Sequence, residues 1–174
     1  VYQTPVGTLY QQTQEIVKND LESIGIEVEL KLVDTQVMFG TGAANPDSAF
    51  RFNADMQEFD VRSSNPDPSS YMGFWQSTRI PQLSNNWAAA LNMERWVNET
   101  YDQLYAQAAV ELDPEVRAEL FIQMNDLLIE DVVMIPIVLR AEVLGVDKTL
   151  DPNSMNLTPW DRITWNIKDW RPNP

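Results

Sequence analysis

The sequence predicts an α/β fold in which helices flank a mixed sheet, and three neighbouring features support this prediction. Residues 8–24 place apolar side chains at helical spacing. Gly25 follows, at a position where the end of a helix favours a left-handed residue. Residues 26–33 (IEVELKLV) then alternate apolar and charged side chains, which is typical of a strand with one buried face. A helix that leads into a strand through a single glycine predicts an α/β unit.

Further strands are expected along the rest of the chain. Residues 50–59 indicate a second strand, whose alternation is less regular in its second half. An irregular stretch rich in Asn, Ser, Pro and Trp then continues to about residue 97. Residues 133–146 are rich in β-branched side chains and predict one or two strands, with Pro136 at an edge or at a strand start.

Two further helices are expected between residues 101 and 128. Asp113-Pro114 separates them and is a typical start signal, because aspartate caps the first turn and proline fits the first helical position. Because the link is short, the two helices are expected to pack antiparallel. Their apolar positions are Tyr101, Leu104, Tyr105, Ala108 and Leu112 in the first helix, and Val116, Leu120, Phe121, Met124, Leu127 and Leu128 in the second.

Length and composition limit the possible functions. The 174 residues, 44% of them hydrophobic, fit a single domain that spans residues 1–174. Twelve basic and 26 acidic residues give a formal charge of −14, which argues against nucleic acid as a partner. With no His and no Cys, the chain cannot build a Ser-His-Asp or Cys-His nucleophile, a thiolate metal site or a disulfide. The start at Val1, without Met or a signal pattern, indicates an excised piece or a mature fragment.

Motifs for nucleotides, metals and catalysis are weak. The Gly-Thr-Gly triplet at 40–42 lacks the remaining residues of a dinucleotide or phosphate loop. Asp147 and Asp151 lack the glycine and terminal glutamate of a calcium loop, so a turn is preferred there. No cofactor and no metal are therefore expected. Glu58 and Asp60, about 7 Å apart if they share a strand face, leave a small carboxylate-based hydrolase as a weak alternative.

The aromatic and proline-rich stretches carry the stronger signals. Trp75 and Trp87 lie in the irregular stretch and are candidates for ligand contact, because large aromatic side chains line peptide and sugar sites. Trp165 and Trp170 recur near the end of the chain and are expected to anchor it to the core. The stretch 63–71 (SSNPDPSSY) is either a surface loop or the rim of a binding site.

The ordered set of segments resembles a known protein family. LESIGIEVEL leads to ADMQEF and then to NPDPSSY, and NMERWVNETYDQL, the helical pair up to VMIPIVLR and a closing WNIKDW follow. This order and spacing are similar to the C-terminal lobe of the family 5 extracellular solute-binding proteins. Those are the oligopeptide-, dipeptide- and nickel-binding components of bacterial ABC importers. Residues 101–137 carry the most specific part of the resemblance.

The resemblance implies a fold and a function. The fold is the C-terminal lobe of a periplasmic-binding-protein-like (type II, cluster C) protein, so the chain represents most of the second lobe and the N-terminal lobe is missing. The intact protein captures a peptide between two lobes and delivers it to an ABC permease in the membrane, without enzymatic activity. Its location is extracytoplasmic, either periplasmic or on the cell surface as a lipoprotein. An oligosaccharide or another non-peptide solute is the alternative ligand, and a plain interaction domain is a further alternative.

The resemblance also indicates which residues face the ligand. In peptide-binding members an Asp four residues before the last Pro of the Pro-Asp-Pro loop takes the α-amino group, and the matching position here is Ser64. Asp60 or Asp67 is expected to replace this anchor if the ligand is a peptide, whereas Arg62 suits a carboxylate or a sugar. The position of a family Trp is taken by Val61. The residues expected at the ligand are Asp60, Val61, Arg62, Ser64, Asn65, Asp67, Trp75, Asn92 and Arg140.

Overall fold

The computed structural model describes residues 1–40, 45–61, 65–87, 91–139, 143–158, 160 and 163–173. Its strands are β1 (Tyr2–Pro5), β2 (Leu30–Val33) and β3 (Met56–Gln57). Its α-helices are α1 (Thr8–Ser23), α2 (Thr35–Met38), α3 (Ser69–Met72), α4 (Glu99–Ala108) and α5 (Pro114–Glu130). Short 3₁₀ turns occupy Gly73–Trp75, Ser77–Arg79, Leu83–Asn85, Pro152–Ser154 and Ile167–Asp169. Within the described residues, no helix combines the length and the apolar character needed to cross a membrane.

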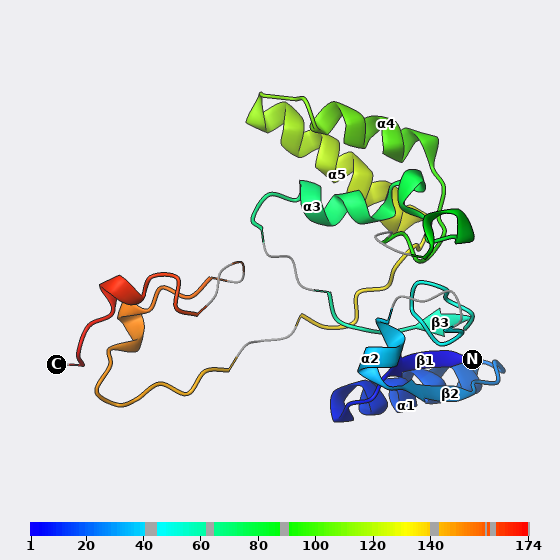
Figure 1. Ribbon diagram of the computed structural model, residues 1–174, viewed down its shortest axis with the longest axis horizontal. Helices are drawn as coiled ribbons and strands as arrows, with labels where there is room; N and C mark the ends of the chain where they lie inside the picture. The colour runs from blue at the N-terminus through cyan, green and yellow to red at the C-terminus, as the bar shows by residue number, and fades with distance from the viewer. Residues whose placement is uncertain are drawn as a thin grey trace.

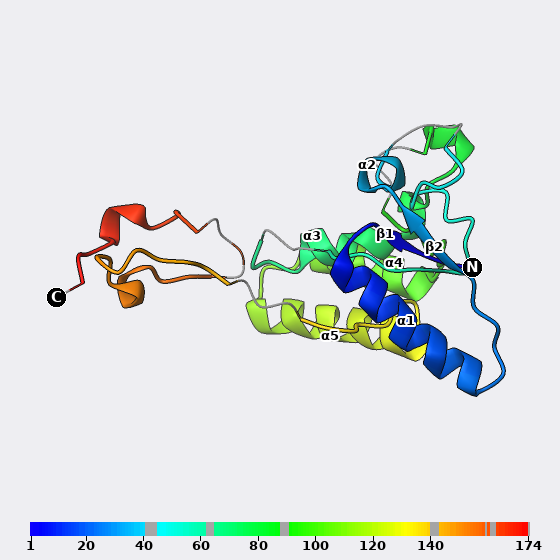
Figure 2. The same ribbon diagram turned by 90° about the horizontal axis from the view of Figure 1, so that it is seen from below.

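The three strands form a parallel sheet with β1 in the centre. The order is β2-β1-β3, and Tyr2 of β1 pairs with Leu30 on one side and with Met56 on the other. Helices α1 and α2 lie on opposite sides of the strands (Figure 2). The buried Gln14 of α1 donates a 2.6 Å hydrogen bond to the carbonyl of Tyr2, which fixes the helix to the central strand. The α/β fold class is confirmed, although the described strands are all parallel where a mixed sheet was expected.

The strands are shorter than the sequence pattern predicts. Only Met56–Gln57 of the expected strand 50–59 pairs with β1, because Arg51 and Phe52 instead form a turn on the carbonyl of Ser48. Residues 133–139 and 143–146 form no strand, although their β-branched side chains favour one. The central strand β1, which the apolar pattern does not reveal, buries all four of its residues.

The helical part of the fold agrees with the prediction more closely. Asn98 caps α4 through the amide of Tyr101, and Asp113 caps α5 through the amides of Glu115 and Val116, with Pro114 in its first turn. Helices α4 and α5 pack against each other and against α3 (Figure 1). Their core consists of Met72, Trp75, Tyr101, Ala108, Leu120, Phe121, Met124 and Leu128.

Two positions in the expected apolar stripes are exposed. Leu112 is 94% exposed, because α4 ends at Ala108 and Leu112 lies in the link to α5. Val116, in the first turn of α5, is also exposed. The expected stripes therefore fail in the link between the helices and in the first turn of α5, whereas their other positions are buried or half-buried.

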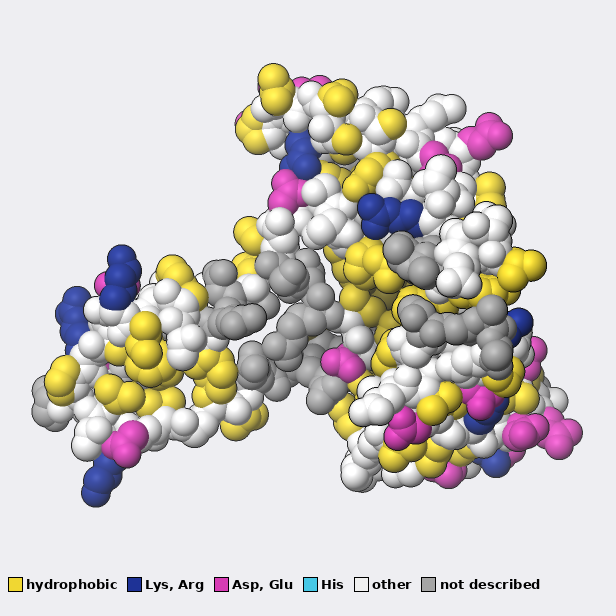
Figure 3. Space-filling model, viewed as in Figure 1, with side chains coloured by type: hydrophobic (Ala, Val, Ile, Leu, Met, Phe, Trp, Pro, Cys, Tyr) yellow, Lys and Arg dark blue, Asp and Glu magenta, His cyan; other side chains and the backbone are white. Residues whose placement is uncertain are grey.

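The C-terminal segment, residues 143–158, 160 and 163–173, lies apart from the sheet and the helices (Figure 1). An antiparallel bridge between Leu150 and Pro172 closes it. The indole N–H groups of Trp165 and Trp170 bond to Asn156 and Asn166 of the same segment. The expectation that these tryptophans anchor the chain end to the main core is therefore wrong. Hydrophobic side chains also gather on the surface of this segment (Figure 3).

Candidate functional site

The sheet topology places a switch point between β1 and β3. After β1 the chain passes through α1 to β2 on one side, and the next strand, β3, lies on the other side of β1. In open parallel sheets, ligands bind beyond the carboxyl ends of the strands at such a point. At this edge of the sheet, β1 is followed by Val6 and Gly7, which lead into α1, and β3 is followed by residues 58–61.

Tyr10 and Asp60 meet across this switch point. The hydroxyl of Tyr10, in the first turn of α1, donates a hydrogen bond to Oδ1 of Asp60. Gly7 leaves room for the ring, because a Cβ there would lie 3.1 Å from Cδ2 of Tyr10. Asp60 is exposed, and a carboxylate can accept more than one hydrogen bond. The first turn of α1 carries no acidic side chain and no side-chain cap, so its N–H groups add positive potential beside this carboxylate.

Apolar side chains border the same edge of the sheet. Phe39, which follows α2, packs edge-on against Phe59 with ring centroids 5.5 Å apart. Val61, one of the expected ligand contacts, is 45% exposed two residues further on. Asp34 at the end of β2 is used differently, because it caps α2 through the amides of Gln36 and Val37. The switch point therefore combines one exposed carboxylate with an aromatic and aliphatic border.

The Pro-Asp-Pro loop is fixed to the helices. Asp67 accepts two hydrogen bonds from the guanidinium of Arg117, at 2.7 and 3.1 Å, and a third from the amide of Ser69 at 2.8 Å. These bonds hold the pKa of Asp67 well below its usual range. Asn65 supports the turn by accepting a 3.0 Å bond from the amide of Asp67. Because Arg117 already compensates the charge of Asp67, this carboxylate is a poor candidate for the amine anchor.

Asn92 and Trp75 lie in the interior. The amide nitrogen of Asn92 donates to the carbonyls of Trp75, Gln76 and Trp96, and its oxygen accepts from the amide of Trp96. Trp75 packs edge-on against Tyr71 at 5.0 Å and belongs to the helical core. These contacts use all the polar atoms of the Asn92 side chain, so we do not include either residue in the candidate site.

Three of the expected ligand contacts, Arg62, Ser64 and Arg140, lie outside the described residues. The sequence indicated Asp60 but not its partner Tyr10, nor the positioning roles of Gly7 and Arg117. The sequence offers one local signal for Gly7, namely its position in the Val6-Gly7 pair just before the first helix. This pair can be interpreted as the end of β1 only when that strand is already known. The two acids proposed for a hydrolase accept hydrogen bonds from different tyrosines: Glu58 from the hydroxyl of Tyr2, and Asp60 from that of Tyr10.

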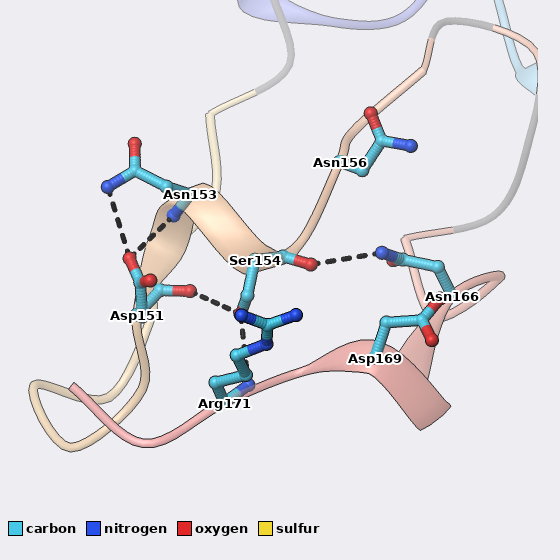
Figure 4. A pocket seen from close by; sticks show the side chains of 7 residues that line it. All are labelled: Asp151, Asn153, Ser154, Asn156, Asn166, Asp169 and Arg171. Atoms are coloured by element: carbon cyan, nitrogen blue, oxygen red, sulfur yellow. Dashed lines mark hydrogen bonds between the residues drawn. The ribbon is translucent and has the colours of Figure 1, made fainter.

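A polar cavity of about 350 Å³ lies in the C-terminal segment (Figure 4). Its groups mostly bind one another: Ser154 accepts from the amides of Asn166 and Arg171, and Asp151 accepts from Asn153. The turns expected at Asp147 and Asp151 are present. No group of three potential metal ligands occurs in the part of the chain that the structure describes. Because most of its polar groups already bind one another within the segment, we do not place the candidate site there.

Comparison with known proteins supports the fold. No family model matches the sequence, and no curated protein matches it. The structure is similar to the oligopeptide-binding protein from Thermus thermophilus, solved in complex with a pentapeptide, with a TM-score of 0.64 and 23% sequence identity. The match covers 76% of this chain and 23% of that chain, so this chain spans less than a quarter of the length of its neighbour. The likeness shows that this chain shares the fold of part of that protein.

Proposed function

We propose that this chain is one lobe of a solute-binding protein that captures peptides for an ABC importer. The observation that carries this proposal is the Tyr10–Asp60 pair at the switch point of a sheet whose fold is similar to that of an oligopeptide-binding protein. The captured solute lies between this lobe and a second one. The closed protein acts outside the cytoplasm and delivers the solute to a permease in the membrane. The role is binding and release, without chemistry on the solute.

Asp60 is the proposed anchor for the α-amino group of the peptide. An ammonium donates up to three hydrogen bonds, and a charge-assisted bond to a carboxylate contributes about 1.5–3 kcal/mol. Tyr10 restrains the carboxylate from one side, which lowers the entropy that binding would otherwise lose. Phe39 and Val61 supply the apolar contacts beside it.

A row of exposed apolar side chains supports the presence of a second lobe. Residues 135–139 (IPIVL) include Ile135, Ile137 and Val138, all exposed, and Leu139 at 98% exposure. Contiguous apolar surface of this kind marks an interaction site. In the proposed two-lobed protein, these residues are covered by the segments that join the lobes or by the other lobe.

The decisive test is mass spectrometry of the solute that co-purifies with the intact protein and is released by denaturation. We expect a mixture of short peptides. Asp60→Asn should abolish their retention, whereas Asp126→Asn, which removes another exposed negative charge, on α5, should leave it unchanged. Recovery of an oligosaccharide or of a single non-peptide solute would overturn the peptide proposal and favour the alternative ligand. Retention of peptides by both variants would move the anchor away from Asp60.

A further inference from the structure

Two arginines flank one tryptophan on the surface of the sheet part. The guanidinium carbon of Arg51 lies 4.9 Å from the centre of the Trp87 ring, and that of Arg95 lies 6.0 Å from it. Arg95 also donates hydrogen bonds to the carbonyls of Arg51 and Met93, which tie the two turns together. The three side chains come from separate turns of the chain and converge only in the folded structure.

The backbone is strained at this place. Phe52, Asn86, Trp87 and Arg95 have φ values of 44°, 54°, 56° and 55°. They are four of the six non-glycine residues with positive φ in the described ranges. Bulky side chains rarely adopt this conformation, and such residues gather at sites where geometry serves function. Asn86 tolerates it, but an aromatic and an arginine do so only when the surrounding contacts hold them there.

The charge of the cluster is unusual for so acidic a protein. The formal charge of the chain is −14, yet among the described residues Arg95 forms no ion pair with an acid. Its neighbour Glu94 is not the counter-ion, because that carboxylate is largely buried and acts electrostatically on Tyr71 in the helical part. The Arg95 guanidinium is exposed and retains N–H donors beyond those that bind the two carbonyls.

We propose that Arg51, Trp87 and Arg95 form a binding subsite for a carboxylate group of the captured solute. A guanidinium fork matches the two oxygens of a carboxylate, and an indole face holds guanidinium planes in place. This assignment rests on the proposed function in that the carboxylate belongs to the captured solute. Arg95 donates a hydrogen bond to the carbonyl of Met93, which belongs to the sheet cluster (Val33, Met38, Ala49 and Met93). Phe59, which precedes Asp60 in the chain, packs against the same cluster.

The test is an NMR titration of the protein with three probes that carry no amine and therefore do not depend on Asp60. N-acetyl-alanyl-alanine has a terminal carboxylate, N-acetyl-glutamate α-amide has only a side-chain carboxylate, and N-acetyl-alanyl-alanine amide has none. The indole N–H resonance of Trp87 is assigned by its loss in Trp87→Phe. We expect this resonance to shift saturably with a carboxylate probe and not with the amide. The carboxylate probe that saturates at the lower concentration identifies a terminal or a side-chain carboxylate as the natural group.

Variants separate binding from structure. Arg95→Lys keeps the charge but loses the fork, and should weaken carboxylate binding about tenfold. Arg171→Lys, in the C-terminal segment, is the matched control and should bind as the wild type does. If Arg95→Lys lowers the melting temperature, Arg51→Lys tests the same subsite with the Arg95 hydrogen bonds intact. Equal shifts with the amide probe, or unchanged affinity in a folded Arg51 or Arg95 variant, overturn the proposal.

The two proposals fail separately. If the carboxylate probes bind here but the intact protein releases no peptides, the peptide function is overturned and the subsite stands. If peptides co-purify but the probes do not bind at Trp87, the subsite alone is overturned.

Discussion

The hydroxyl of Tyr10 donates a hydrogen bond to the carboxylate of Asp60, a residue 50 positions later in the chain. This bond joins the start of α1, which follows the central strand β1, to the segment that follows β3. The sheet topology therefore brings the two side chains together. It also restrains the orientation of the whole carboxylate group. The pair is therefore the most specific link between the fold and the proposed amine anchor.

Tyr10→Phe should weaken the binding of peptides with a free amino terminus by about three- to tenfold, because it removes a hydrogen bond worth about 1 kcal/mol that orients Asp60. Isothermal titration of the full-length protein with a tripeptide measures this effect. Gly7→Ala, whose Cβ would press on the Tyr10 ring, should have a similar effect without altering either polar group. N-acetylated tripeptide is the control, and an equal loss for both ligands would contradict a role in amine binding.

Asp67→Asn should lower the free energy of unfolding at pH 7 by about 1 kcal/mol, a value limited by the partial exposure of the Asp67–Arg117 pair. The pKa of Asp67 is lowered in the folded state, mainly by its hydrogen bond from Arg117. The contribution is therefore present above the ordinary aspartate pKa of 3.8 and is lost as the pH falls below it. Urea denaturation of the wild type and the variant at pH 7 and pH 3 checks both statements.

A matched control is the similarly exposed pair of Lys18 and Glu22 on α1, whose Nζ and Oε1 atoms lie 3.6 Å apart. Glu22→Gln should change the free energy of unfolding by less than about 0.5 kcal/mol, because helix-surface pairs of this spacing contribute little. Equal effects of Glu22→Gln and Asp67→Asn would show that Arg117 does not fix the Pro-Asp-Pro loop.

Local signals predicted the helices, whereas the strands depend on partners far away in the chain. Asn98 and Asp113 cap α4 and α5 within a few residues, so those helices are visible in the sequence. The central strand β1 is not, because its buried Gln3 and Thr4 interrupt the apolar pattern that marks a strand. Residues 133–139 show the opposite error, since β-branched residues form a strand only when a neighbouring strand pairs with them.

The candidate site was predictable only in part, for the same reason. Asp60 stands out as an acid after a strand pattern, but its partner is set by the parallel pairing of β1 with β3. Asn92 is the reverse case: an asparagine in an irregular stretch indicates function, yet burial and four hydrogen bonds make it the centre of a turn. Sequence patterns identify the residue type and leave its surroundings undetermined.

Asn92→Ala should lower the free energy of unfolding by about 3 kcal/mol, because it leaves several buried backbone groups without a partner. Urea denaturation of the purified chain measures the loss. Asn65→Ala, which removes an exposed asparagine that supports one turn, is the control and should cost no more than about 1 kcal/mol. A stable Asn92→Ala protein with reduced solute binding would instead return Asn92 to the ligand site.

Glu94→Gln should raise the free energy of unfolding at pH 7 by about 1 kcal/mol, because it replaces a largely buried charge with a neutral group of the same shape. Oε2 of Glu94 is buried without a hydrogen-bond partner, and burial raises the pKa of this carboxyl. The folded state therefore prefers the protonated form. The contribution of Glu94 to the free energy of unfolding is therefore greatest below the ordinary glutamate pKa of 4.5. It falls as the pH rises through the higher pKa of the folded state.

The measurement is urea denaturation of wild type and Glu94→Gln from pH 4.5 to pH 8, with the exposed Glu27→Gln as the control. The gain in Glu94→Gln should grow as the pH rises and then level off, while Glu27→Gln should stay within about 0.5 kcal/mol of the wild type throughout. A Glu94→Gln protein that is less stable than the wild type at pH 7 would mean that the negative charge itself stabilises the fold. Such a result would require a cationic group beside Glu94 that its burial and its raised pKa do not indicate.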